Sequence, residues 1–131
     1  MFFTKKFLLS LLLATTLGTI ATTSSAAGKI ENATMEEVTY AIETTLKYAE
    51  ETLEALNNGA DKETILDLIR KTKQIAKEIE VTRLGPPKMK ASAQMKKARF
   101  AVRKDEMEKA KEHVEAGVKH YQVLRKRFYD F

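Results

Sequence analysis

The chain of 131 residues contains no cysteine, two adjacent prolines and five glycines. Without cysteine there is no disulfide, no thiol catalysis, no cysteine-type zinc or iron–sulfur site and no covalently attached haem. Gly-rich phosphate loops and dinucleotide fingerprints are missing as well. No segment alternates apolar and polar residues with the period of two that marks a half-buried strand. We therefore expect a non-enzymatic, all-helical protein that packing alone stabilises.

Residues 1–27 have the pattern of a cleaved signal peptide. Lys5 and Lys6 precede an uncharged apolar run over residues 7–21, and small residues follow up to Gly28. The run is shorter than the roughly 20 residues that a membrane-spanning helix needs. We therefore predict that residues 28–131 form one periplasmic or secreted domain, with no membrane contact after cleavage. The alternative is a membrane anchor that is retained.

Four helices are predicted in this domain. The first begins at a capping box of Thr34 and Glu37 and runs to about residue 56, where Gly59 ends it. The second begins at Asp61 and runs to about residue 79. After two prolines the third spans residues 89–103. The fourth carries the longest apolar stripe, with steps of three and four: Met107, Ala110, Val114, Gly117, Tyr121, Leu124 and Phe128.

Two features of the second half leave alternatives open. Residues 89–103 could bury Ala91, Met95, Ala98 and Val102, or instead the face of Met89, Ala93 and Phe100. Asp105 and Glu108 resemble a second capping box, so we expect a turn there, whereas one continuous helix over residues 89–129 is the alternative. Gly117 weakens its helix, so we expect close approach of a neighbouring helix or of a large side chain such as Phe100.

The two halves resemble each other at an offset of 42 residues. Ile65, Leu68, Thr72, Ile75 and Ile79 then correspond to Met107, Ala110, Val114, Gly117 and Tyr121. Two amphipathic helices joined by a short turn form a hairpin, and two hairpins can cover each other's apolar stripes. The sequence therefore predicts an up-down four-helix bundle made of two hairpins, over residues 28–131.

Charge divides the chain. Residues 28–82 hold 7 basic and 12 acidic side chains, while residues 83–131 hold 14 and 6. The simplest interpretation is that the halves attract each other across helix faces. The alternative is a basic surface for an acidic partner such as an anionic lipid, a cell-wall polymer or nucleic acid. Export argues against nucleic acid.

Histidine is the first candidate for metal binding. His113 and His120 lie on one face of the last helix, about 10.5 Å apart along its axis at 1.5 Å per residue. No ligand stands three or four residues from either one, so a metal there needs ligands from other helices. Glu43, Glu50, Glu51 and Glu54 could collect Ca²⁺, but Lys47 lies four residues from both Glu43 and Glu51, which favours local ion pairs.

Haem is a further candidate cofactor. Met35 and His120 have the layout of the axial ligands in a b-type bundle cytochrome, a class similar to this chain in size, export signal and helix count. The C-terminal histidine of that class falls near Lys126 here. A cytochrome of this type is an electron carrier, which is the second functional class that we consider.

Residues 46–53, Leu-Lys-Tyr-Ala-Glu-Glu-Thr-Leu, carry a resemblance to a family. They resemble the repeated helical pattern of the small metal-binding proteins of the bacterial periplasm, and Asn58-Gly59 and Val118-Lys119-His120 are similar to the same family. The resemblance implies an exported helical bundle that binds divalent metals, notably copper, through histidines. Tyr48 stands where the family carries histidine, which leaves His113 and His120 as the ligands that it implies.

The combined expectation is a non-enzymatic exported binding or stress-related module. Its metal binding would be weak or lost. The alternatives are the haem electron carrier and an interaction protein that uses its basic second half.

Overall fold

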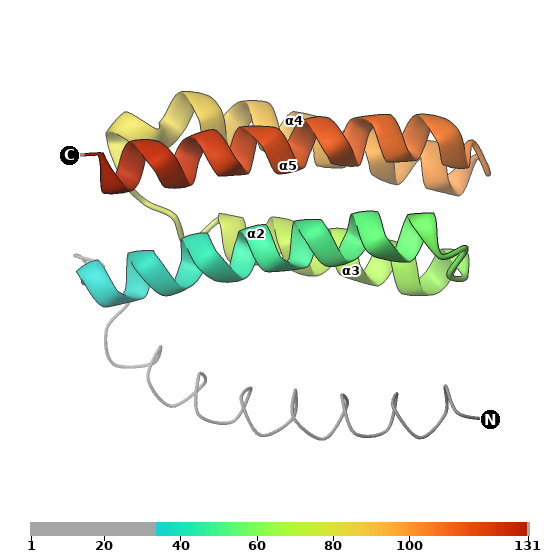
Figure 1. Cartoon of the computed structure of the whole chain (residues 1–131), viewed down its shortest axis with the longest axis horizontal. Helices are drawn as coiled ribbons and strands as arrows, with labels where there is room; N and C mark the ends of the chain where they lie inside the picture. Colours follow the sequence, from blue (N-terminus) through green and yellow to red (C-terminus); the bar gives the residue numbers. More distant parts are fainter. Residues whose placement is uncertain (1–33, 131) are drawn as a thin grey trace, which may run out of the picture. The chain divides into compact units, whose positions relative to one another are not determined.

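The structure, a computed structural model, describes residues 34–130, and four α-helices occupy most of this range (Figure 1). They are α2 (Met35–Asn57), α3 (Lys62–Ala76), α4 (Gly85–Arg103) and α5 (Met107–Tyr129). A single 3-10 turn, η1 (Thr82–Leu84), precedes α4. No strand occurs within residues 34–130. The predicted all-helical class is confirmed, while the predicted signal peptide lies outside the described residues.

The helices form two antiparallel hairpins, α2–α3 and α4–α5, that pack on each other (Figure 1). Helix α2 contacts α3 and α5, and α4 contacts the same two helices from the other side. Helices α2 and α4 therefore lie on opposite corners of the bundle. This is the predicted up-down four-helix bundle. The outer surfaces of α2 and α4 consequently face away from each other.

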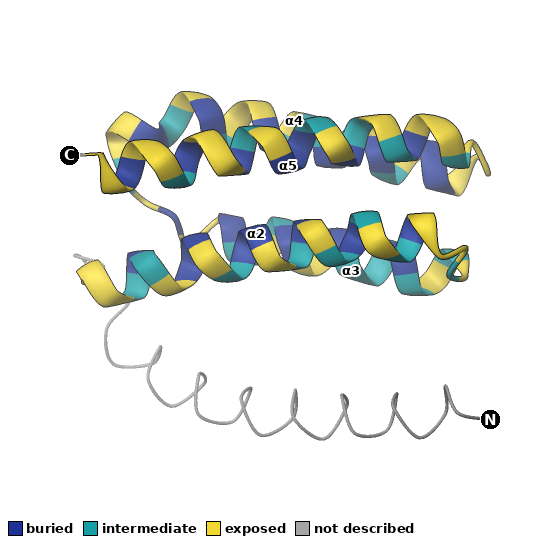
Figure 2. Cartoon of the chain, viewed as in Figure 1, coloured by how far each residue is buried: buried dark blue, intermediate teal, exposed yellow. Residues whose placement is uncertain are grey.

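The core runs along the bundle axis, and all four helices contribute to it (Figure 2). The predicted stripe of the last helix is confirmed from Ala110 to Phe128, with Met107 only partly buried. In α4 the face of Ala91, Met95, Ala98 and Val102 is the buried one. Met89 and Phe100 instead remain 72% and 46% exposed. The open question about the orientation of this helix is thus answered.

The structural repeat has a different offset from the predicted one. The buried positions of α3 and the residue that follows it are Ile65, Ile69, Thr72, Ala76 and Ile79. They correspond, 45 residues later, to Ala110, Val114, Gly117, Tyr121 and Leu124. The offset of 42 was wrong because it aligned Leu68 and Ile75, which are only partly buried.

Both hairpins turn through the same backbone motif. Gly59 has φ 69° and Asp105 has φ 60°, both in the left-handed region. The next residue in each case donates its N–H five residues back, from Ala60 to the Ala55 carbonyl at 2.9 Å and from Glu106 to the Ala101 carbonyl at 2.8 Å. These are the bonds of a Schellman helix end. The predicted turn after Arg103 is confirmed, and a continuous helix is excluded.

Two predicted helix starts need correction. Asp105 does not cap α5; it ends the preceding helix, and the N-cap position is Glu106, without a side-chain cap. The prolines do not delay the third helix to Met89. They occupy the first turn of α4, which begins at Gly85, because the N–H groups of a first turn need no helical acceptor.

Gly117 permits the close approach that we expected, but its partner is Met95 rather than Phe100. A Cβ atom on Gly117 would lie 2.9 Å from the Met95 sulfur. Real Cβ atoms do not approach a heavy atom so closely. Glycine therefore makes room for the methionine between α4 and α5.

Candidate functional site

The predicted metal ligands do not form a cluster. His113 Nδ1 lies 2.8 Å from the amide oxygen of Gln94 on α4, and His120 lies two turns further along the same flank of α5. Within residues 34–130, no group of three or more His, Asp or Glu side chains is placed to hold a metal ion. Binding of copper by His113 and His120 stays a prediction.

The predicted haem ligands lie on separate parts of the bundle. His120 is on the α4 flank of α5, whereas Met35 begins α2, which does not contact α4. Met35 is also 66% exposed. Between α2 and α5 the interior is filled by Val38, Ile42, Tyr121 and Leu124. The haem hypothesis gains no support from this placement and stays a prediction.

The ion pairs that we expected within the acidic helix α2 do not form. Lys47 forms no ion pair with another described residue. Glu43 instead forms an ion pair with Arg125 of α5 at 3.3 Å. Its carboxylate also accepts a hydrogen bond from the Tyr129 hydroxyl at 2.9 Å. This hydrogen bond to the Glu43 carboxylate raises the pKa of Tyr129. Exposed pairs of this kind contribute about 0–1 kcal/mol each to the free energy of unfolding.

Helix α4 is the most one-sided element in charge. It contains six basic residues and no acidic residue: Lys88, Lys90, Lys96, Lys97, Arg99 and Arg103. None of the six forms an ion pair with another residue in the range 34–130. Only Lys88 has a polar partner, the Ile79 carbonyl at 2.9 Å. The expected attraction between the halves is seen in the ion pair of Arg125 with Glu43, and the cations of α4 take no part in it within residues 34–130.

The outward surface of α4 combines these cations with apolar groups. Met89, Ala93 and Phe100 follow one another along its outermost line, because they are separated by four and seven residues. Lys90 and Lys97 lie on the side toward α5, and Lys96 and Arg103 lie on the side toward α3. All of these residues are exposed. We call this set the basic face.

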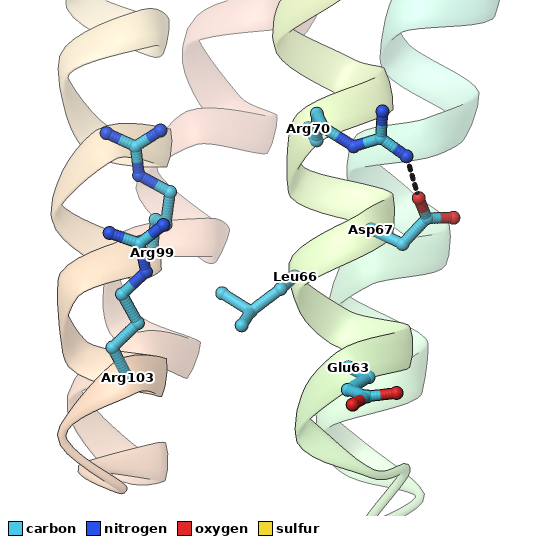
Figure 3. A pocket seen from close by; sticks show the side chains of 6 residues that line it. All are labelled: Glu63, Leu66, Asp67, Arg70, Arg99 and Arg103. Atoms are coloured by element: carbon cyan, nitrogen blue, oxygen red, sulfur yellow. Dashed lines mark hydrogen bonds and ion pairs between the residues drawn. The ribbon is translucent and has the colours of Figure 1, made fainter.

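A groove of about 310 Å³ runs between α3 and α4 beside the basic face (Figure 3). Leu66 points from α3 toward α4, and Arg99 and Arg103 form the α4 wall one turn apart. Glu63 of α3 lies at the lower end of the view. We call this space the α3–α4 groove.

Asp67 and Arg70 on the α3 wall of the groove are already paired with each other. Arg70 turns to Asp67, and Lys71 reaches the same carboxylate at 3.3 Å (Figure 3). The hydrogen bond from Arg70 lowers the pKa of Asp67, burial opposes this shift, and Lys71 adds to the lowering. Asp67 is therefore satisfied without the arginines of α4.

The α4 wall is unpaired. Neither Arg99 nor Arg103 donates a side-chain hydrogen bond to a described residue, and the Arg99 Nε is covered without an acceptor. The Arg99 guanidinium lies 5.6 Å from the Phe100 ring centre. That contact, together with burial of the aliphatic stem, accounts for the position of the side chain. It leaves the N–H donors unused.

Comparison with family models, with curated proteins and with solved structures finds no match for this chain. None of the helices within residues 34–130 has the length and apolar content of a membrane span. The arrangement of the side chains is therefore the basis for a functional proposal.

Sequence reasoning noticed the basic second half but missed its concentration on one helix. The signal was present, because residues 81–104 contain no acidic residue. From the sequence alone, the simplest interpretation of these basic residues was as counter-charges to the acidic first half. The groove could not be found in the same way, since it depends on α3 and α4 being neighbours.

Proposed function

We propose that the protein is a non-enzymatic, exported binding module that holds a linear acidic polymer on the basic face of α4. The single observation that carries this proposal is the lack of any ion pair at the six cations of α4 within residues 34–130. Export is supported by the signal-peptide pattern of residues 1–27. An acidic partner outside the cytoplasm would supply the charge that the bundle itself does not.

The fold does not need these cations. The exposed positions of α4 tolerate any good helix former, and like charges one turn apart destabilise a helix by about 0.2–0.5 kcal/mol per pair. Lys96 and Arg99, and Arg99 and Arg103, are spaced in this way. General solubility would be served as well by a mixture of both signs. A set of one sign with no counter-charge instead favours a partner of opposite sign.

The shape of the face suits an extended chain. Nineteen residues of helix span about 28 Å, with basic side chains near the start, the middle and the end. A linear polyanion lying along α4 could contact all of them at once and release its condensed counterions, which makes binding fall steeply with salt. Met89 and Phe100 would cover uncharged parts of such a chain. A compact acidic ligand would reach only part of the face.

Two matched variants test the proposal in protein purified after expression of the full chain. Lys90→Glu/Lys97→Glu reverses two charges on the basic face, and Lys126→Glu/Arg127→Glu makes the same net change at exposed positions of α5. Fluorescence anisotropy with a labelled linear polyanion, at about 0.15 M salt where charges more than about 8 Å away are screened, reports affinity. We expect at least a tenfold loss for the α4 variant and less than threefold for the control.

Equal losses for the two variants would show that net charge alone governs binding, and would overturn the proposal. So would affinity that stays constant between about 0.05 and 0.2 M salt, because counterion release requires a steep decline. Circular dichroism of each variant ensures that the bundle is intact, so that a loss of binding can be assigned to the surface.

A further inference from the structure

The α3–α4 groove adds cations to those of the basic face. Arg99 lines the groove beside Arg103 of that face, and Lys73 stands on α3 one turn beyond the lining residue Arg70. Burial lowers the pKa of the Lys73 amine, and repulsion from neighbouring cations lowers it further. Those neighbours are Arg99, Lys96 and Lys77. The two helices therefore bring positive charges together near the groove.

The carboxylates nearest to these cations do not relieve the repulsion. Asp67 is shared by Arg70 and Lys71. Glu63 forms no ion pair with a described residue. Two guanidinium groups one turn apart are thus left with free N–H donors above an apolar floor provided by Leu66.

We propose that the α3–α4 groove is a phosphate-binding subsite, in which Arg99 and Arg103 hold a phosphate group of the polymer and Lys73 and Lys96 complete its charge neutralisation. This inference rests on the proposed function, since it names the chemistry of the same acidic partner. It concerns the α3 side of the basic face, where Arg103 and Lys96 of that face lie beside Arg99 and Lys73. The basic face provides affinity for any linear polyanion, and the groove provides preference for phosphate.

Geometry favours phosphate over carboxylate in this groove. A guanidinium presents its donors in a planar fork that matches two oxygens of one acid group, and an ammonium is a point charge without this fork. A phosphate offers more acceptor oxygens than a carboxylate, so two forks approaching from one wall can each find acceptors on a single group. A carboxylate has only two oxygens, so two bidentate guanidinium groups on one wall would have to share the same pair of acceptor atoms.

The test compares linear polyphosphate with poly-L-glutamate of matched length and charge. In the variant Arg99→Lys/Arg103→Lys the charge is kept and both forks are removed. We expect the unaltered protein to bind polyphosphate at least tenfold more tightly than polyglutamate, and the variant to bind the two within about twofold. The matched control Arg125→Lys/Arg127→Lys makes the same exchange on α5 and should keep the preference.

A second readout reports on the groove directly. The pKa of Lys73, followed by NMR of its side-chain carbons, should rise when polyphosphate binds, because a bound anion favours the charged amine. Polyglutamate held on the basic face should leave it nearly unchanged. A merely structural role of Arg99 and Arg103 would not move this pKa on addition of ligand.

The outcomes separate the inference from the function on which it rests. If neither polymer binds, both fail. If both bind with equal affinity and steep salt dependence, the polymer-binding function stands and the phosphate subsite is wrong. If inorganic phosphate binds to the groove as tightly as polyphosphate, the site serves a free small anion and the subsite assignment is likewise overturned.

Discussion

The two hairpins turn through the same Schellman motif but bury different kinds of side chain. Within the described residues, the α2–α3 hairpin buries branched aliphatic residues such as Ile42, Leu46, Ile65 and Ile69, and no aromatic residue or methionine. The α4–α5 hairpin buries a wider range of sizes, from Ala98 and Gly117 to Met95 and Tyr121. Interiors are packed as densely as organic crystals, so a long side chain requires a small residue or a close helix opposite it. In the second hairpin, Gly117 provides that space for Met95.

The hairpins also differ in which of their charged side chains form ion pairs. In α3 the carboxylate of Asp67 is paired within its own helix, and Glu43 of α2 is paired with α5. In α4 the cations have no carboxylate partner among residues 34–130. Similar backbones therefore carry surfaces of different kinds. Packing is shared between the hairpins, whereas α4 is the one described α-helix that forms no ion pair within residues 34–130.

The largest expected effect concerns the large side chains of the first hairpin. Ile69 and its counterpart Val114 are both fully buried. We expect Ile69→Ala to lower the free energy of unfolding by about 2–5 kcal/mol through lost burial and a cavity. Val114→Ala should cost about 1 kcal/mol less, because it removes one carbon fewer. Urea denaturation followed by circular dichroism measures both, and equal losses would contradict the difference in packing.

The next largest effect on stability comes from giving one hairpin the residue found at the equivalent position of the other. Gly117→Thr gives α5 the residue that α3 carries at Thr72, and its Cβ would meet the Met95 sulfur. We expect a loss of about 1–3 kcal/mol from overpacking. Adding Met95→Ala should recover part of that loss, as a double-mutant cycle can measure. If the double variant were less stable than the two single effects combined, the close contact would not be the cause.

A smaller effect concerns the left-handed residues of the two turns. Gly59→Ala and Asp105→Ala each place alanine at positive φ, which costs roughly 1–2 kcal/mol. Asp105→Asn should change stability by less than about 0.5 kcal/mol, because asparagine tolerates this conformation and only the exposed pair with Lys62 is lost. A large loss for Asn would assign the role of Asp105 to its charge rather than to its backbone.

The smallest expected effect is an increase, rather than a decrease, in the free energy of unfolding. The Thr45 hydroxyl of α2 is buried without a hydrogen-bond partner, whereas Thr72 donates to the Leu68 carbonyl at 2.8 Å. We expect Thr45→Val to raise the free energy of unfolding by about 1 kcal/mol, since it removes an unsatisfied polar group. Thr72→Val should stay within about 0.5 kcal/mol, because it also gives up a hydrogen bond. Thermal melts of the pair test this contrast.

Much of the fold follows from local pattern. The stripe of α5, the turn at Gly59 and the start of α3 after Asp61 were all predicted, because periodicity and turn residues act over a few residues; the Asp61 side chain, however, makes no cap hydrogen bond. The turn at Asp105 was expected for the wrong reason. Its side chain looked like a cap, yet the backbone adopts the conformation usually reserved for glycine, which chain geometry after α4 imposes.

The candidate site was harder to predict than the fold. The charge division was visible in composition, but ion pairs depend on which helices are neighbours, and α2 and α4 are not. The partner of Gly117 was misassigned for a similar reason. Phe100 and Met95 lie close together along α4. The rotation of the helix about its axis decides which of them faces α5.

Periodic apolar residues, strong helix formers and turn residues were sufficient to establish four helices and their pairing into hairpins, because these depend on interactions close along the chain. Assembly of the hairpins settled the rest: the burial of Met95 against Gly117, the separation of acidic α2 from basic α4, and the groove beside Arg99 and Arg103. These features join residues distant in the chain, and their distances exist only once four helices share one core.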